Sequence, residues 1–565
     1  MNMKKFFYIV LLSLWFYPCF AQQRAVERIY ISTDRTFYVA GERIWLSLYC
    51  FDLSQNERRF SGVSNVAYVE LRNDSSLVSS AKLRIDRGRG SGVLTIPRAL
   101  PTGNYRLIAY TKQMLNEEEL AAFDRVIPIF NTLTVERLPE GVLFEDKDGE
   151  PTEPNAALPL SDSRHIEVKL GHHQQVVPPN HSLPLSLKNV SGEAITFSLS
   201  IARTEPPMAQ NPSLQEFFTH NQPGSTRRSL QERYIPEFEG EVIRGRITNI
   251  QNITSKERLI FLSAVGTELI IYDSSVDPKT GEFTFFTNSL YGNREIALEY
   301  STSDEVSYEL YDPFIKPPVQ PVPPLHLDTR YKLLLSQRSV GMQISHRFEV
   351  DTLYERVAVW DDPFTYNYKP LVYLLDDYTR FPTMQDIVME YVTEMKFRRI
   401  NGQPSFQIFL LDWGKAFMDN TLVMIDGIAI LDQERLVQYD PLKVKSLSIY
   451  PYRYRVGNSI FNGIAKVDTY TGKYPGLTLG KNALIIDYQG VQLPSRFTGK
   501  FLETSDNFPD VRTLLYWDPL LELTTGAHQE INLKTSSIPG EYTIVLEGVT
   551  TSGIPICFRS EFRVE

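Results

Sequence analysis

Apolar and polar residues alternate over short segments through most of the chain, at the two-residue period of half-buried β-strands. The first such segments are residues 29–31 and 44–50, and a turn at Ala40-Gly41 separates them. Further strands are expected at 67–71 and 93–96, and a Pro-Thr-Gly turn at 101–103 precedes an alternating return strand. This series predicts a β-sandwich over residues 24–136.

Two more groups of alternating segments follow. Strands expected at 166–170, 183–187 and 197–201 predict a second β-sandwich over residues 137–232, and its polar end, residues 205–233, is expected to be a long loop. Strands expected at 242–247 and 259–265, and then the turn at Gly281 before Phe283 and Phe285, predict a third sandwich over residues 233–312.

The pattern changes after a proline-rich linker at residues 313–327, which is expected to be a semi-rigid spacer. Apolar residues at helical spacing run from Met384 to Met395 behind a capping signal at Thr383. Apolar strands are expected at 406–411, 422–425, 428–430 and 444–450. Residues 328–482 are therefore predicted to form a small α+β domain, and residues 483–565 a C-terminal β-sandwich. The predicted fold class is mainly β.

The first predicted sandwich carries a recognisable series of residues, namely Thr33, Asp34, Tyr38, Gly41, Glu42, Pro101, Thr102, Gly103 and Tyr105. This series resembles the macroglobulin-like, Ig-like β-sandwich of bacterial α2-macroglobulin relatives. Such proteins trap proteases through a bait region and a thioester in a Cys-Gly-Glu-Gln sequence. Neither Cys50 nor Cys557 lies in that sequence, so the resemblance does not imply the trap mechanism.

Residues 328–482 resemble the plug domain of TonB-dependent receptors. The matching positions are Asp426, Gly427, Gly457, Gly463 and Thr469. Residues 233–312 resemble the carboxypeptidase regulatory-like sandwich, and the whole order of domains resembles a group of Bacteroidetes secreted proteins. A plug normally lies inside a β-barrel, and the residues after 482 lack the repeated amphipathic strands of a barrel. The resemblance therefore implies a barrel partner on another chain.

The beginning of the sequence predicts export. Lys4 and Lys5 precede an apolar run at residues 6–16, and Ala21 is suited to signal-peptidase cleavage, so residues 1–21 are predicted to be a signal peptide. No later segment is apolar enough to be expected to span a membrane. We expect a periplasmic protein associated with the outer membrane.

The net charge and the absence of certain motifs argue against several classes of function. A net charge of -10 without a basic block argues against nucleic acid as a partner. The sequence has no nucleophile elbow, phosphate-binding loop or clustered metal ligands, so no catalytic residue, metal or cofactor is expected. Once the signal peptide is removed, only Cys50 and Cys557 remain, and both are expected to be small buried side chains.

One strand has the composition of an interface. Tyr450, Tyr452 and Tyr454 alternate with Pro451, Arg453 and Arg455, which would place tyrosines on one face and arginines on the other. Tyrosine and arginine are enriched at interface hot spots. Ordinary half-buried sheet packing is the alternative.

Three functions remain open. The first is a non-enzymatic adaptor that presents the plug-like domain to an outer-membrane protein. The second is a ligand-binding accessory module in TonB-linked nutrient uptake. The third is a degenerate macroglobulin-type inhibitor, which would need a cleavable loop such as residues 205–233.

Overall fold

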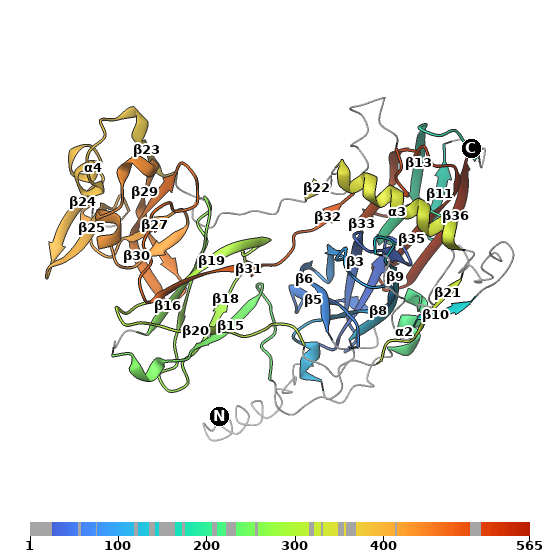
Figure 1. The fold of residues 1–565 in the computed structure, drawn as a ribbon, viewed down its shortest axis with the longest axis horizontal. Helices are drawn as coiled ribbons and strands as arrows, with labels where there is room; N and C mark the ends of the chain where they lie inside the picture. Colours follow the sequence, from blue (N-terminus) through green and yellow to red (C-terminus); the bar gives the residue numbers. More distant parts are fainter. Residues whose placement is uncertain are drawn as a thin grey trace, which may run out of the picture.

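The structure of the chain is a computed structural model. The structure describes residues 25–54, 58–74, 76–117, 122–134, 142–145, 164–171, 176–205, 212–221, 233–254, 258–315, 321–328, 331–348, 355–356, 369–412, 415–497 and 510–565. The predicted signal peptide lies outside these residues. The described part is mainly β, as predicted, and Figure 1 shows two lobes, with the first and second sandwiches in one and the third sandwich and the α+β unit in the other.

The first sandwich is one long sheet that folds over itself. Its order is β1-β3-β7-β6-β5-β8-β9-β2, and β4 adds to β3. The strands are β1 (Glu27–Thr33), β2 (Tyr38–Val39), β3 (Arg43–Asp52), β4 (Arg59–Phe60), β5 (Val66–Arg72), β6 (Leu77–Asp86), β7 (Arg89–Thr95), β8 (Gly103–Tyr110) and β9 (Phe123–Phe130). The face of β1 packs on β8 and β9, so the alternating residues share one core. Cys50 is buried in that core, as expected, and Cys557 is only partly buried.

The second sandwich corrects the predicted domain boundaries. One sheet is β11-β13-β34 and the other is β12-β36-β35-β14-β33. Its strands come from both ends of the chain, namely β11 (Ile166–Leu170), β12 (Val176–Val177), β13 (Ser182–Asn189), β14 (Ile195–Arg203), β33 (Leu514–Leu523), β34 (His528–Lys534), β35 (Gly540–Thr550) and β36 (Pro555–Val564). The sandwiches predicted at 137–232 and 483–565 are therefore one domain, because neither set of strands could close a core without the other.

The predicted loop at 205–233 contains a packed helix. This helix, α2 (Leu214–His220), has a capping box between Ser213 and Glu216. Leu214, Phe217 and Phe218 are buried in the core of the first sandwich. The helix was missed because seven residues give too short a helical period to detect. This packing argues against residues 214–220 as a cleavable loop.

The third sandwich is completed by a strand from later in the sequence. Its sheets are β18-β15-β20 and β17-β16-β19-β31. The strands are β15 (Val242–Ile247), β16 (Leu259–Ala264), β17 (Ile271–Ser275), β18 (Glu282–Phe286), β19 (Asn293–Tyr300), β20 (Tyr308–Leu310) and β31 (Ala483–Gln489). Thus the segment that was predicted to start a C-terminal domain instead pairs along β19.

The proline-rich segment and the helix after it lie on the first sandwich. Pro321 and Pro323 accept hydrogen bonds from Arg106 and Asn104, and β21 (Leu325–Asp328) pairs with β10 (Val142–Glu145). The helix α3 (Lys332–Arg347), drawn in yellow in Figure 1, contacts β2. The described part of residues 313–327 is thus not a free spacer, and α3 does not belong to the α+β unit.

The α+β unit occupies residues 371–469. Its main sheet is β23-β29-β30-β27-β28, and a second sheet is β24-β25-β26. The elements are β23 (Leu371–Leu374), α4 (Met384–Glu390), β24 (Met395–Ile400), β25 (Gln403–Phe409), β26 (Phe417–Met418), β27 (Leu422–Ile425), β28 (Ile428–Ile430), α5 (Glu434–Val437), β29 (Val444–Val456) and β30 (Ser459–Thr469). The predicted helix is shorter than expected, because α4 ends at Glu390 and Met395 begins β24.

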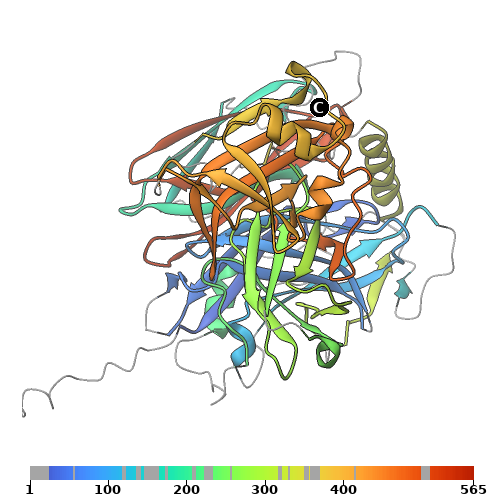
Figure 2. The ribbon, with the colours of Figure 1, turned by 90° about the vertical axis from the view of Figure 1, so that its left-hand side faces the viewer.

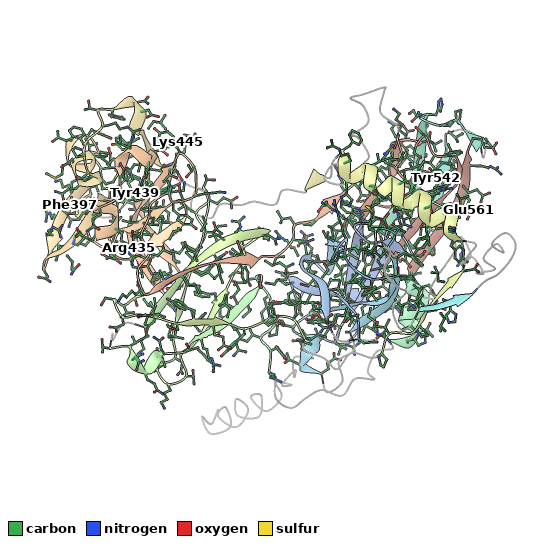
Figure 3. All side chains as sticks on the ribbon, in the orientation of Figure 1. Phe397, Arg435, Tyr439, Lys445, Tyr542 and Glu561 are labelled. Carbon is green, nitrogen blue, oxygen red and sulfur yellow. The ribbon has the colours of Figure 1, made fainter. Side chains whose placement is uncertain are left out.

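The α+β unit is packed on the third sandwich. Figure 2 shows the unit in orange above the green sandwich. A separate apolar cluster joins them, with Phe261, Leu269 and Ile271 on the sandwich facing Tyr450 and Phe461 of the unit. Figure 3 shows the side chains that fill both lobes, with Phe397 and Tyr439 in one and Tyr542 in the other. The unit is thus held by its own chain.

Candidate functional site

The Tyr-Arg strand is the C-terminal half of β29. The tyrosines of this half are more buried than the arginines: Tyr452 and Tyr454 are half-buried, whereas Arg453 and Arg455 are exposed. A β-bulge falls between Tyr450 and Arg453. The bulge interrupts the regular alternation on which the predicted tyrosine and arginine faces rested.

Tyr450 and Tyr454 pack toward the third sandwich. Tyr450 is buried in the cluster that joins the two units, and its ring meets that of Tyr454 edge-on with centroids 6.3 Å apart. Tyr450 is therefore corrected from a docking residue to an internal contact, because apolar surface of the same chain covers it. The exposed Arg453 and Arg455 remain candidates.

Arg453 and Arg455 line a cleft. Its volume is about 1120 Å³, and it lies between the β29–β30 hairpin and strands β17 and β18. The opposite wall carries Asp277, Glu282 and the exposed ring of Phe286. The cleft thus has basic, acidic and aromatic walls that are open to solvent.

The plug-motif residues Asp426 and Thr469 are in direct contact. Asp426 is buried, and its carboxylate accepts hydrogen bonds from Thr469 N (2.7 Å), Thr469 Oγ1 (2.6 Å) and Tyr474 N (2.6 Å). Asp426 and Gly427 form the tight hairpin turn predicted, with φ of 45° and 82°. The aspartate therefore fixes the turn to the end of β30.

The motif glycines mark close approaches. A Cβ on Gly427 would collide with Ala264 O of the third sandwich, and one on Gly457 would collide with the Asp273 carboxylate. A Cβ on Gly463 would come within 2.8 Å of the Ile408 side chain. Two of the three glycines thus serve the contact between the α+β unit and the third sandwich.

Asp273 on β17 fastens the β29–β30 hairpin, and its sequence context gave no signal for this role. Its carboxylate accepts hydrogen bonds from Asn458 N (3.1 Å), Ser459 N (3.0 Å) and Ser459 Oγ (2.6 Å). Asp273 and the hairpin are 185 residues apart in the chain. Only the folded arrangement reveals the pair.

Asp273→Ala is expected to weaken the hairpin contact by about 2 kcal/mol, because hydrogen bonds to a charged acceptor contribute that much. Faster amide hydrogen exchange at residues 456–459 would report it. Glu305→Ala, an exposed carboxylate on the same sandwich, is the control and should leave exchange there unchanged. Equal exchange in both variants would show that Asp273 does not hold the hairpin.

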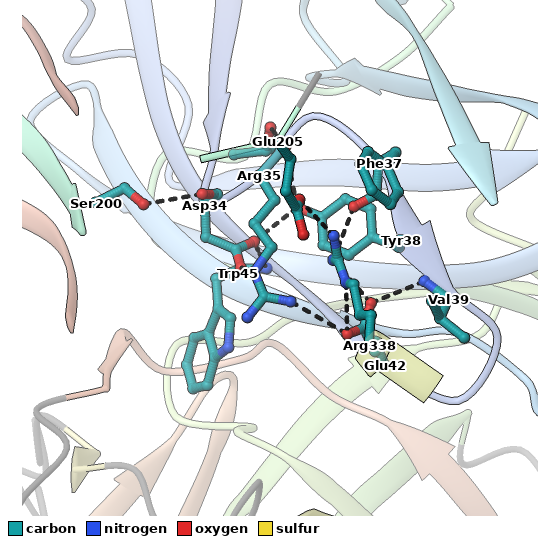
Figure 4. A network of polar contacts seen from close by, with 11 residues as sticks. Asp34, Arg35, Phe37, Tyr38, Val39, Glu42, Trp45, Ser200, Glu205 and Arg338 are labelled. Atoms are coloured by element: carbon teal, nitrogen blue, oxygen red, sulfur yellow. Dashed lines mark hydrogen bonds and ion pairs between the residues drawn. The ribbon is translucent and has the colours of Figure 1, made fainter. Parts of the chain in front are cut away.

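The macroglobulin-like series belongs to a buried polar network rather than to an exposed site (Figure 4). Asp34 accepts hydrogen bonds from Tyr38 Oη (2.6 Å) and Trp45 N (3.0 Å). Glu42 accepts from Val39 N (2.8 Å). Burial raises the pKa of Asp34 to about 6, against the opposing effect of Arg35.

Arg338 of α3 lies at the centre of this network. Its guanidinium donates to Glu42 Oε1 (3.0 Å), Glu42 Oε2 (2.9 Å), Glu205 Oε2 (2.5 Å) and Phe37 O (2.9 Å). Burial opposes the ionisation of Arg338 and of Glu42. Even so, the charges of Glu205 and Glu42 raise the pKa of Arg338, and the charges of Arg338 and Arg35 lower the pKa of Glu42. The network attaches α3 to the first sandwich.

The return-strand tyrosines have one role in two domains. Tyr105 Oη donates to Pro101 O (2.7 Å), and Tyr542 Oη donates to Ile538 O (3.0 Å). Each hydroxyl thus reaches back four residues to pin the turn before its strand, as in a tyrosine corner. Thr102 Oγ1 accepts from Asn131 N (2.9 Å). These residues of the series are structural.

Neither a protein-family model nor a curated protein matches the sequence. Among solved structures, the native α2-macroglobulin of Escherichia coli aligns with 96% of this chain and 40% of its own, at 10% identity and a TM-score of 0.24. Salmonella α2-macroglobulin reacted with methylamine aligns with 95% and 39%, at 8% identity and a TM-score of 0.22. The Escherichia coli adhesin FdeC aligns with 48% and 59%, at 12% identity and a TM-score of 0.14. The chain spans about two fifths of the length of these macroglobulins. At such TM-scores the likeness carries no argument, and the fold described above rests on the strand pairings.

Proposed function

We propose that this protein is a non-enzymatic adaptor of the cell envelope, which presents its α+β unit to an outer-membrane β-barrel protein. The main support is one apolar edge of that unit. Strand β23 pairs on one side with β29 and is the last strand of its sheet among the described residues. Leu371, Val372 and Leu374 on it are 39%, 54% and 45% exposed.

An exposed apolar edge strand is unusual, because natural proteins protect such edges with lysine, proline or bulges to prevent pairing with other chains. The described strand has none of these within its four residues. Next to it, Arg380 donates hydrogen bonds to Pro441 O and Tyr470 Oη, and Leu442 and Tyr470 are also exposed. The edge therefore suits strand addition by a partner.

The orientation of the unit supports the same function. The opposite edge of the sheet is β28, which packs on β16 and β19 of the third sandwich. The α+β unit is thus held at one edge and open at the other, as an adaptor requires. None of the described helices is long and apolar enough to cross a membrane.

Affinity purification from detergent-solubilised envelopes tests this proposal. We expect a β-barrel protein to co-purify with the wild type and to be lost with Val372→Lys or Leu374→Lys, because a lysine opposes pairing at an apolar edge. The control is Leu333→Lys, a similarly exposed leucine on α3, which should keep the partner. Recovery of the wild type without any barrel protein would contradict the adaptor function.

A second candidate is a binding module for a soluble peptide or glycan, and the cleft beside Arg453 and Arg455 favours it. One double variant distinguishes the two functions. Arg453→Ser/Arg455→Ser should abolish ligand binding if the cleft is the site, and should leave barrel capture unchanged if β23 is the docking edge.

A further inference from the structure

The two lobes meet where residues 233–241 and 488–492 cross the first sandwich. Asn65 N donates to Glu237 O (2.8 Å), and Gln492 exchanges backbone hydrogen bonds with Lys82 O (2.7 Å) and Arg84 N (3.2 Å). We call this contact the lobe joint. It is formed by few backbone hydrogen bonds, so the side chains between them matter for its stability.

Two glutamates are buried in the lobe joint. Glu237 and Glu241 are each 1% exposed. Glu241 Oε1 accepts from Lys82 Nζ (2.5 Å) and Tyr488 Oη (2.5 Å). Glu237 Oε1 accepts from Tyr68 Oη (2.8 Å) and Val242 N (2.9 Å). The cluster thus joins β5 and β6 of the first lobe to β15 and β31 of the second.

The two carboxyl groups differ in charge compensation. Glu241 has a direct ion pair with Lys82. Glu237 has no ion pair among the described residues. Its Oε2 is buried without a hydrogen-bond partner, as is Oε2 of Glu241, so Glu237 alone has neither that bond nor a counter-charge. A carboxyl oxygen in that position costs much less free energy when the group is neutral, because ionisation in a buried site requires donors or a counter-charge.

The charged groups around Glu237 do not remove this cost. Burial raises the pKa of Glu237 to about 7, and Glu241 contributes to the increase; the hydrogen bonds from Val242 and Tyr68 and the charge of Lys112 oppose it. Lys112, over the ring of Tyr68 at 4.2 Å, has its own pKa lowered by burial. Lys82 is engaged by Glu241, and burial raises the pKa of Tyr68 and Tyr488, so both remain neutral.

We propose that the lobe joint is a proton-sensitive latch, which is closed while Glu237 carries its proton and loosens when the Glu237 carboxyl ionises. A cavity of about 570 Å³, lined by Glu237, Glu241 and Tyr488, lies beside the carboxyls. When the joint loosens, water from this cavity reaches the ionised group. The relative placement of the lobes thereby depends on pH.

The direction of the effect follows from the two states. In the open joint, the Glu237 carboxyl is in water and has its ordinary pKa of 4.5, whereas in the closed joint the pKa is about 7. Between these values the open state binds fewer protons, so closure weakens as pH rises, and above about pH 7 this group no longer changes it with pH. One group with these values changes the opening constant about seventyfold between pH 5 and pH 8.

Hydrogen exchange of the whole protein, corrected for the intrinsic pH dependence of exchange, tests the latch. In the wild type we expect protection of residues 64–72 and 242–247 to fall between pH 5 and pH 8. Glu237→Gln imitates the neutral carboxyl and should keep these segments protected at pH 8. Glu239→Gln, an exposed glutamate two residues away, should behave as the wild type does.

Two results would overturn the latch. One is wild-type protection of these segments that does not change with pH, a measurement that needs no variant to fold. The other is a Glu237→Gln protein that shows the full wild-type dependence, which would assign the titration to another group.

Discussion

Replacing Arg338 with methionine is expected to destabilise the first sandwich by about 3 to 5 kcal/mol, because it leaves buried carboxylates without their counter-charge. Glu205 loses its ion pair with Arg338. Among the described residues, Glu42 keeps an ion pair with Arg35 alone, whose Nη1 lies 3.1 Å away. Urea unfolding, combined with hydrogen exchange at residues 37–46, would measure the loss. The helix α3 should also become more accessible to exchange, since the ion pairs attach it to the sandwich.

The chain offers controls for the Arg338 experiment. Arg347 is exposed on the same helix, and Arg347→Met should change stability by less than about 0.5 kcal/mol. The triple variant Arg338→Met/Glu42→Gln/Glu205→Gln removes the uncompensated charges and should recover much of the loss. A single variant as stable as the wild type would show that the ion pairs contribute nothing net.

The Arg338 network shows what the sequence could and could not predict. Asp34, Tyr38 and Glu42 stand out in the sequence as a spaced series, and they do act together. Their partner Arg338 is 296 residues from Glu42, in a helix with no distinguishing pattern. Local spacing therefore identified Asp34, Tyr38 and Glu42. It could not identify Arg338, because tertiary packing alone brings that residue to the network.

The same limit applies to the domains. Alternation identified individual strands well, because a half-buried strand requires it regardless of which strand lies beside it. Alternation does not say which strands share a sheet. Strand β13 pairs with β34 across more than 300 positions, so two predicted sandwiches merged into one. Similarly, β31 was assigned to a C-terminal sandwich, although it pairs with β19 of the third sandwich.

At the candidate site, the sequence identified the motif residues but not the part of the chain that they contact. Asp426, Gly427 and Gly457 have the turn and close-packing roles that such residues usually have. What they pack against is the third sandwich of their own chain. The exposed edge β23 was missed, because Leu371-Val-Tyr-Leu374 reads as any buried strand until its neighbours are known.

Gly427→Ala is expected to separate the α+β unit from the third sandwich. The added Cβ would press against Ala264 O, a backbone atom that a strand holds in place, and would also approach Gly266 O at 2.8 Å. Overpacking of this kind costs about 1 to 3 kcal/mol. It adds to about 1 to 2 kcal/mol for an alanine at positive φ.

Gly402 supplies a matched control within the same unit. It follows Asn401 in the turn between β24 and β25, with φ of 82°, the same value as Gly427, and nothing lies within 4 Å of its added Cβ. Gly402→Ala should therefore show the backbone cost alone. The difference between the variants in thermal midpoint, and in hydrogen exchange at residues 264–266, measures the contact between units. Equal losses in the two variants would mean that the turn does not contact the sandwich. A larger loss in Gly427→Ala would show that the absence of a side chain at this position lets the α+β unit pack closely on the third sandwich.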